Sequence, residues 1–252
     1  MKRMILSGLF GFLIIFTVAY STIAPSSVLA TSQAAAPVSP QLVKIPMADG
    51  LEIWGDFYMA AGTEKAPAAL LLHQFNGSSF EWREFAVPLA EQGYNVLAID
   101  MRGQGLTGGD IDWKLAESDG VALMGWLREQ DTVDPDHVAV IGASIGANLA
   151  LRVCAQDDAC HAVIALSAGL GYFGVATKDV VAGMKHKALF LVASQNDTPA
   201  GNDIKDLAAA APSSADVLMH IYASSNRHGT AMFSFPDLIP MMLQWLENYN
   251  KG

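Results

Sequence analysis

Cysteine and basic residues are scarce in this 252-residue chain, and each shortage narrows the possible functions. The two cysteines are Cys154 and Cys160, and neither their spacing nor their neighbours indicate a metal site. In an oxidising compartment they could close a small loop, or they could remain buried thiols, and the sequence leaves both open. Lysine and arginine number 15 against 25 acidic residues, a formal net charge of −10. Nucleic acids and anionic membranes are therefore poor partners.

The first 30 residues are typical of an export signal. Two basic residues precede an apolar run over 4–20, and cleavage is expected after Ala30. The alternative is an uncleaved membrane anchor, although the run is slightly shorter than the roughly 20 residues of a spanning helix. We therefore predict a secreted or periplasmic protein, which would meet a membrane only if this segment stays attached.

Residues 31–41 are rich in alanine and proline and are predicted to be a flexible linker, and residues 42–252 to form one domain. After a β-hairpin at 42–59, apolar runs alternate with segments of helical spacing. Strands are expected at 68–72, 94–99, 138–141, 161–166, 188–193 and 217–223, and helices at 79–92, 116–130, 147–156, 203–211 and 238–249. This alternation predicts an α/β fold, a mostly parallel sheet with helices on both faces.

Two of these segments carry further expectations. In the helix at 116–130, we expect Val121, Met124 and Leu127 to share the buried face. About twenty residues separate the strands at 161–166 and 188–193, too few for a separate cap domain.

The pentapeptide Gly142-Ala143-Ser144-Ile145-Gly146 lies between an expected strand and an expected helix. A turn this sharp strains the backbone of its central residue, and it needs small residues two positions away on either side. The turn raises the Ser144 hydroxyl above the edge of the sheet and directs backbone N–H groups and the positive end of the helix to the same point. The pattern predicts a nucleophile with an adjoining anion site.

Polar residues that follow the apolar runs supply partners for this serine, because reacting groups gather at the carboxyl ends of parallel strands. Asp197 follows the run at 188–193, and His228 follows the last strand. A serine needs a base to remove its proton, and a carboxylate can fix the tautomer of that base. We predict His228 as the base and Asp197 as its partner. The alternative for Asp197 is a cap of the helix near Pro199.

The intermediate of such a reaction carries an oxyanion that needs hydrogen-bond donors. The backbone N–H groups of Ile145 and of Phe75 or Gln74 are the expected pair, and Tyr172 and Phe173 are expected to border the substrate pocket.

The remaining polar candidates have simpler structural roles. His73 borders the expected oxyanion loop but is predicted to be structural, and Asp100 and Arg102 are predicted to shape their own loop. Packing or surface roles are expected of His137, His161, His186 and His220, and core positions of Trp82, Trp126 and Trp245.

Over residues 42–252 the chain resembles the α/β-hydrolase family. The resemblance rests on the elbow at Ser144, the strand end His73-Gln74-Phe75, the loop at 100–105, and the order Ser144, Asp197, His228. The family's usual His-Gly is His73-Gln74 here, which leaves the oxyanion donor open between Gln74 and Phe75. The short segment at 169–187 is similar to compact members without a cap, such as dienelactone hydrolases and small carboxylesterases.

These features predict a serine hydrolase that cleaves small-molecule carboxylic esters through an acyl-enzyme, with no cofactor and no metal. The same trio also serves peptidases, amidases and acyltransferases, which are the nearest alternatives. A non-catalytic binding protein that keeps the fold is the alternative from another class.

Overall fold

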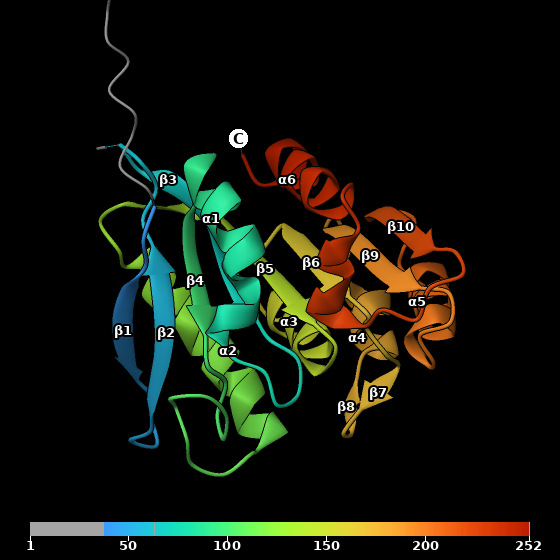
Figure 1. The fold of residues 1–252 in the computed structure, drawn as a ribbon, viewed down its shortest axis with the longest axis horizontal. Coiled ribbons are helices and arrows are strands. Elements are labelled where there is room, and N and C mark those ends of the chain that lie inside the picture. The colour runs from blue at the N-terminus through green and yellow to red at the C-terminus, as the bar shows by residue number, and fades with distance from the viewer. Residues whose placement is uncertain (1–37, 63, 252) are drawn as a thin grey trace, which may run out of the picture. The chain divides into compact units, whose positions relative to one another are not determined.

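The computed structural model describes residues 38–62 and 64–251, which build one large sheet with helices on both faces (Figure 1). The predicted export signal and most of the predicted linker lie outside the described residues. In the described part, the large sheet has the order β1-β2-β4-β3-β5-β6-β9-β10. β2 is antiparallel to β1 and β4, and the other neighbours are parallel.

The elements have the following bounds. The strands are β1 Gln41–Pro46, β2 Glu52–Tyr58, β3 Ala66–Leu72, β4 Asn95–Ile99, β5 Val133–Ala143, β6 Ala162–Leu166, β7 Gly171–Tyr172, β8 Val175–Ala176, β9 Ala188–Ser194 and β10 Asp216–Tyr222. The helices are α1 Arg83–Glu91, α2 Trp113–Arg128, α3 Ile145–Ala155, α4 Lys178–Gly183, α5 Ala200–Ala210 and α6 Leu238–Tyr249, with short 3₁₀ helices η1 Ser79–Trp82 and η2 Gly229–Ser234.

Alternate side chains of the central strands enter two separate hydrophobic cores. In β3, Leu70 and Leu72 belong to the core that also contains residues of α2, α3 and α5, whereas Ala69 and Leu71 belong to the core with residues of α1 and α6. A strand that is covered on both faces has no need of polar residues, which explains the continuous apolar run that predicted it. Because β3, β5, β6, β9 and β10 are parallel, their carboxyl ends share one edge of the sheet, and the loops described below follow from that edge.

The expected α/β architecture is confirmed, with local corrections. The prediction for Val121 was wrong: it is exposed, and the buried face of α2 contains Leu123, Met124 and Leu127. α2 begins at Trp113, earlier than expected, because the Asp112 carboxylate accepts hydrogen bonds from two N–H groups of the first turn. The expected helix at 79–92 is η1 followed by α1.

The segment between β6 and β9 is small, as its length predicted. It contains the two-stranded hairpin β7–β8 and the short helix α4, so the described residues form no separate cap domain. The Asn148 amide of α3 joins both sides of this hairpin: it donates to the carbonyl oxygen of Val175 (2.8 Å) and accepts from the N–H of Gly169 (3.0 Å). The hairpin is thus fixed to the helix that follows Ser144.

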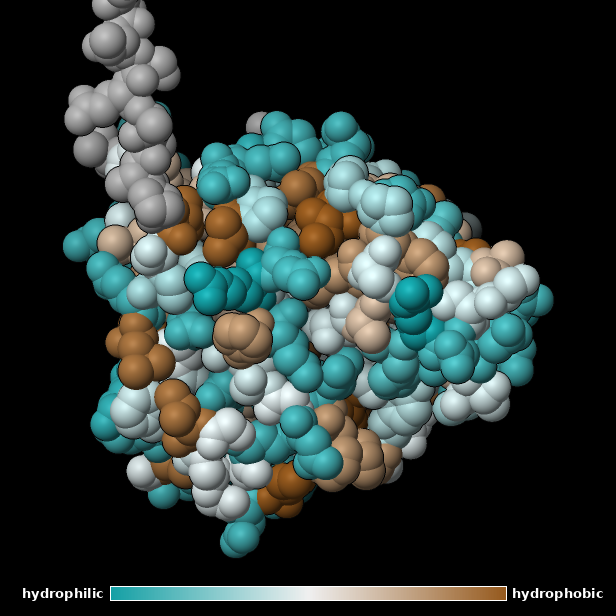
Figure 2. Space-filling model, viewed as in Figure 1, coloured by the Kyte–Doolittle hydropathy of each residue, from teal (hydrophilic) through white to brown (hydrophobic). Residues whose placement is uncertain are grey.

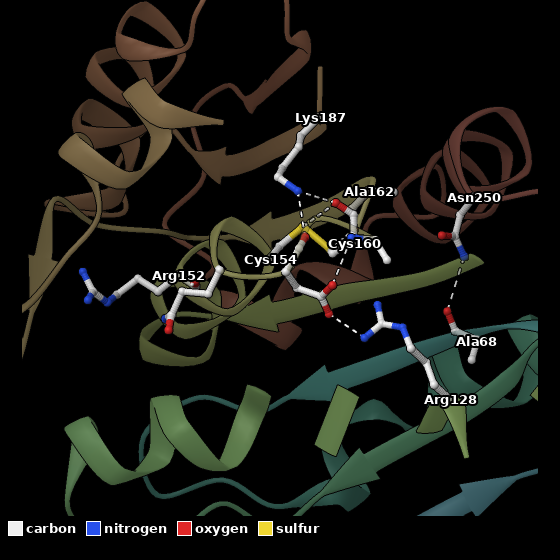
Figure 3. Close-up of a disulfide and its surroundings, with 11 residues drawn as sticks. Ala68, Arg128, Arg152, Cys154, Cys160, Ala162, Lys187 and Asn250 are labelled. Atoms are coloured by element: carbon white, nitrogen blue, oxygen red, sulfur yellow. Dashed lines mark hydrogen bonds and ion pairs between the residues drawn. A yellow bond between two sulfur atoms is a disulfide. The ribbon is translucent and has the colours of Figure 1, made fainter. Parts of the chain in front are cut away.

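Cys154 and Cys160 form a disulfide whose Cα atoms are 5.3 Å apart (Figure 3). The alternative of two buried thiols is therefore not what the structure contains. Two cations hold the closed loop: Lys187 Nζ donates to the carbonyl oxygens of Asp157 (2.9 Å) and Cys160 (2.7 Å), and Arg128 pairs with the Asp157 carboxylate at 2.6 Å. Burial lowers the pKa of Lys187.

On the surface that Figure 2 shows, hydrophilic residues predominate and hydrophobic residues lie in small groups between them. None of the helices in the described ranges is long and apolar enough to cross a membrane.

Candidate active site

Ser144 stands alone between β5 and α3, at the sharpest turn of the site. Its backbone has φ 55° and ψ −121°, a left-handed conformation that costs an L-residue free energy. The neighbouring strand β6 holds Ser144 in this conformation, because the Ser144 N–H donates to the carbonyl oxygen of Leu166 at the end of β6 (2.8 Å). The side chain therefore has a fixed origin at the carboxyl edge of the sheet.

Two glycines make this turn possible. A Cβ atom on Gly142 would overlap the backbone of Gly146, and a Cβ atom on Gly146 would overlap the carbonyl oxygens of Leu72 and His73. The helix therefore approaches β3 and β5 more closely than a side chain at either position would allow.

Asp197 and His228 come from two neighbouring loops and meet at the same edge. The imidazole Nδ1 lies 2.9 Å from each carboxylate oxygen of Asp197. The carboxylate is buried, whereas the His228 side chain is 39% exposed. The Asp197 side chain does not cap α5, whose N-cap is Pro199 with no side-chain hydrogen bond. The Gly229 N–H donates to the Ser167 hydroxyl (2.9 Å), which anchors the chain directly after His228.

A cavity of about 390 Å³ brings most of the predicted site residues together. Its walls contain the predicted residues Gln74, Phe75, Ser144, Tyr172, Phe173, Asp197 and His228, with Thr198 and Pro199 in addition. Ile145 does not line it and has a buried side chain, but as the first residue of α3 it has an N–H that no intrahelical carbonyl can accept. Thr198 and Pro199 were not predicted, although their position directly after Asp197 was a usable signal.

His73 fixes the loop that follows β3. The Met101 N–H can only donate, so His73 Nε2 accepts from it (2.9 Å) and the ring proton is on Nδ1, which donates to the carbonyl oxygen of Gln74 (2.6 Å). The Gly77 N–H donates to the same oxygen (3.0 Å). Burial lowers the pKa of His73. The imidazole is thus a neutral structural group, in agreement with its predicted role.

Asp100 and Arg102 also hold loops, as predicted. Asp100 accepts from the N–H groups of Ser79 (2.7 Å) and Leu106 (2.6 Å). Arg102 pairs with the buried Asp119 through two nitrogens, at 2.9 and 2.8 Å, and with Asp49. These hydrogen bonds raise the pKa of Arg102. The loop after β4 is therefore tied to η1, to α2 and to the turn between β1 and β2.

Three aromatic rings line the cavity, and a fourth, Trp113, packs beside them. Phe75 lies 5.1 Å from Phe173 between ring centroids, and Trp113 stacks on Phe173 at 5.3 Å. The Tyr172 ring meets His228 edge to face at 6.3 Å, and burial, with the nearby Asp197 charge, raises the pKa of Tyr172. Trp113 was not predicted here because it is far from the other rings in the sequence.

The other histidines lie away from this cavity. His137 contacts Asp134 at 2.8 Å, and His220 packs against Tyr222 within β10. Trp82 and Trp245 are buried and Trp126 is partly buried, in agreement with their predicted core positions.

Comparison with known proteins identifies the class. A family model described as the alpha/beta hydrolase fold matches residues 67–228. Because this match covers more than half of the chain, the chain belongs to the alpha/beta hydrolase family, as its motifs predicted.

Individual relatives agree with this assignment. A polyketide transferase, ATR5 of Stachybotrys chlorohalonatus, is 31% identical over 46% of this chain and 40% of its own. The chain spans about two fifths of the length of the curated relatives it matches. Among solved structures, the Pyrococcus furiosus esterase Pf2001 has a TM-score of 0.73 at 19% identity, covering 85% of this chain and 92% of its own. A dienelactone hydrolase from Anabaena variabilis has a TM-score of 0.68 at 18% identity, covering 86% and 100%. At these identities the two structures show a shared fold.

Proposed function

We propose that this protein is a serine hydrolase that cleaves carboxylic esters through an acyl-enzyme, with Ser144 as nucleophile, His228 as base and Asp197 as its orienting carboxylate. The observation that carries the proposal is the pairing of His228 Nδ1 with both Asp197 oxygens beside a serine in a left-handed turn, all in one cavity. With the proton on Nδ1, the Nε2 atom is left free to accept the proton of the serine.

The reaction divides into two acyl transfers. The Ser144 oxygen attacks the ester carbonyl carbon while His228 takes the hydroxyl proton, and the imidazolium then protonates the departing alcohol. Water enters, gives a proton to the same imidazole, and attacks the acyl carbon. The bond between that carbon and the Ser144 oxygen then breaks, the imidazolium returns its proton to the serine oxygen, and the acid leaves. No cofactor takes part in either step.

Phe75 is the better candidate of the two for the first oxyanion donor. The C=O and N–H of a trans peptide point in opposite directions, and the Gln74 carbonyl is held toward His73, so the Phe75 N–H points away from that imidazole. The His73 carbonyl lies against Gly146 at the start of α3, which turns the Gln74 N–H away from the helix end. We therefore pair Phe75 with Ile145, each donor being worth about 3 kcal/mol of barrier.

A fluorophosphonate probe tests for the activated serine. We expect wild-type protein to be labelled and Ser144→Ala to remain unlabelled. A folded wild-type protein that resists the probe would instead favour a binding protein of this fold.

Asp197→Asn tests the orienting role. An amide can donate to Nδ1 and so hold the wrong tautomer, and we expect turnover to fall by about 10⁴-fold with little change in thermal stability. Equal losses of activity and stability would assign Asp197 a structural role.

The bond that is cleaved is tested with matched substrates. We expect p-nitrophenyl esters to be hydrolysed much faster than p-nitroanilides of the same acyl group, and the reverse would indicate an amidase or peptidase. Acyl transfer is the second candidate, because a relative is named as a polyketide transferase. Partition of the acyl group to an added alcohol in preference to water would favour it.

We further propose that the protein acts outside the cytoplasm, after cleavage near Ala30. The disulfide supports this proposal, because such bonds persist in oxidising compartments. Mass spectrometry of the native protein tests it: an intact N-terminus in a membrane fraction would indicate an anchor instead.

A further inference from the structure

A second, larger cavity adjoins the candidate active site, and one side chain lines both. This cavity has a volume of about 830 Å³ and lies beside η1, α1 and η2. Gln74 belongs to its wall and also to the wall of the 390 Å³ cavity that contains Ser144. The α/β-hydrolase pattern described above usually has glycine at this position. Because this chain has glutamine there, a side chain forms the wall between the two cavities.

The amide end of Gln74 is held in place directly behind the reacting groups. Its Oε1 atom accepts from the Thr230 N–H (3.3 Å), and its Nε2 atom donates to Glu81 Oε1 (3.4 Å). A Cβ atom on Gly229, the residue after His228, would overlap Gln74 Oε1 and would lie 3.3 Å from the Cβ atom of Ala143, the residue before Ser144. The amide thus fills the space between the Ser144 cavity and the larger one.

The larger cavity suits a hydrocarbon chain. Six of its eleven lining residues are apolar: Val38, Phe80, Val87, Pro88, Ala231 and Phe233. The other five are Gln74, Glu81, Thr230 and the exposed Arg83 and Glu84, whose charged ends can remain in water. Glu81 lies at the boundary, and its Oε2 atom is buried without a hydrogen-bond partner among the described residues. Burial raises the pKa of Glu81, the side chain that meets Gln74.

We propose that Gln74 determines acyl-chain specificity, by closing the Ser144 cavity against an apolar chamber that would otherwise bury the distal carbons of a longer acyl chain. This inference rests on the proposed ester hydrolysis. The acyl chain is the part concerned because the departing alcohol must be protonated by His228, whose side chain is 39% exposed and offers it a path to solvent. The acyl group stays on Ser144, and Gln74 lines the same cavity.

The expected effect follows from the area that an open wall would bury. Each buried methylene contributes about fourfold in affinity or rate. In the wild-type protein, methylenes beyond the Ser144 cavity gain nothing, so kcat/KM should not rise from p-nitrophenyl butanoate to octanoate. In Gln74→Ala, at least two of the four extra methylenes can enter the chamber, so the octanoate-to-butanoate ratio should rise by about tenfold or more.

Two further variants separate volume from other effects. Gln74→Met keeps the length of the side chain without its hydrogen bonds, so its ratio should stay within about twofold of the wild-type value. Adding Ala231→Trp to Gln74→Ala refills the chamber from η2 and should return the ratio toward that of the wild type. The ratio is insensitive to the fraction of active enzyme, because both substrates share one leaving group.

Several results would overturn the inference. A wild-type kcat/KM that rises about fourfold with each added methylene up to octanoate would overturn it, because the wild-type cavity would then already be open. A folded Gln74→Ala variant with an unchanged octanoate-to-butanoate ratio would also overturn it. If Gln74→Ala changed kcat/KM only in a series of acetate esters with longer alcohols, the chamber would hold the alcohol and not the acyl chain. Ester hydrolysis by Gln74→Ala with an unaltered ratio would count only against the specificity role of Gln74. A wild-type protein that neither hydrolyses esters nor reacts with the fluorophosphonate would count against the proposed function itself.

Discussion

Reduction of the disulfide should lower the free energy of unfolding by an amount that depends on the length of the loop it closes, and it should leave esterase activity unchanged. Cys154 and Cys160 are 6 positions apart, so the bond closes a loop of 7 residues. Closing a loop of this length removes conformational entropy from the unfolded chain worth about 2.4 kcal/mol at 25 °C. For a domain of this size, that corresponds to a decrease in Tm of about 5–9 °C.

The assay is thermal unfolding followed by circular dichroism, with wild-type protein in the presence and absence of a phosphine reductant. The double variant Cys154→Ala, Cys160→Ala should show the lower Tm in both conditions, which controls for other effects of the reductant. Esterase activity at 25 °C should be unchanged, because the bond lies at the far end of α3 from Ser144, and Lys187 and Arg128 still hold the loop. A decrease in Tm below about 1 °C would refute the entropic reasoning, and loss of activity would show that the loop supports the catalytic turn.

Two further perturbations test the construction of the site. Gly146→Ala should destabilise the protein by about 1–3 kcal/mol or more in urea unfolding, because its Cβ would overlap the carbonyl oxygens of Leu72 and His73. Gly125→Ala, which faces open space in α2, should instead stabilise it by about 0.5–1 kcal/mol, and similar effects of the two would contradict the packing at the turn. The lowered pKa of His73 means that, below about pH 6.5, the unfolded chain binds a proton that the folded protein resists, so stability should fall with decreasing pH by up to about 1.4 kcal/mol per unit from this group. The decrease in Tm between pH 7 and pH 5 should therefore be smaller in His73→Gln, and equal decreases would show that His73 titrates normally.

The sequence predicted those parts of the fold in which the local pattern and the tertiary structure agree. Continuous apolar runs became the central strands, and the residues that end them lie at one edge, so Ser144, Asp197 and His228 could be chosen from their positions alone. Errors arose where distant contacts decide the outcome. Val121 has the spacing of a buried residue, but α2 turns its neighbour Leu123 toward the core instead.

The walls of the site were harder to predict than its reacting groups. Trp113 stacks on Phe173, a cavity residue about sixty positions away in the sequence, and no periodicity reports such a contact. The tautomer of His73 depends on the Met101 N–H, and the partner of Arg102 is Asp119 in the next helix. The sequence identified Gln74 as unusual, but its place between two cavities emerges only from the three-dimensional packing.

The anchors of the candidate site are largely main-chain groups: the N–H of Ser144 on Leu166, the N–H of Gly229 on Ser167, and the carbonyl of Gln74 on His73. The rings at the entrance take no part in these bonds. Replacement of the Phe75 and Phe173 side chains would therefore remove none of these hydrogen bonds, so the entrance can be reshaped separately from the main-chain geometry behind it.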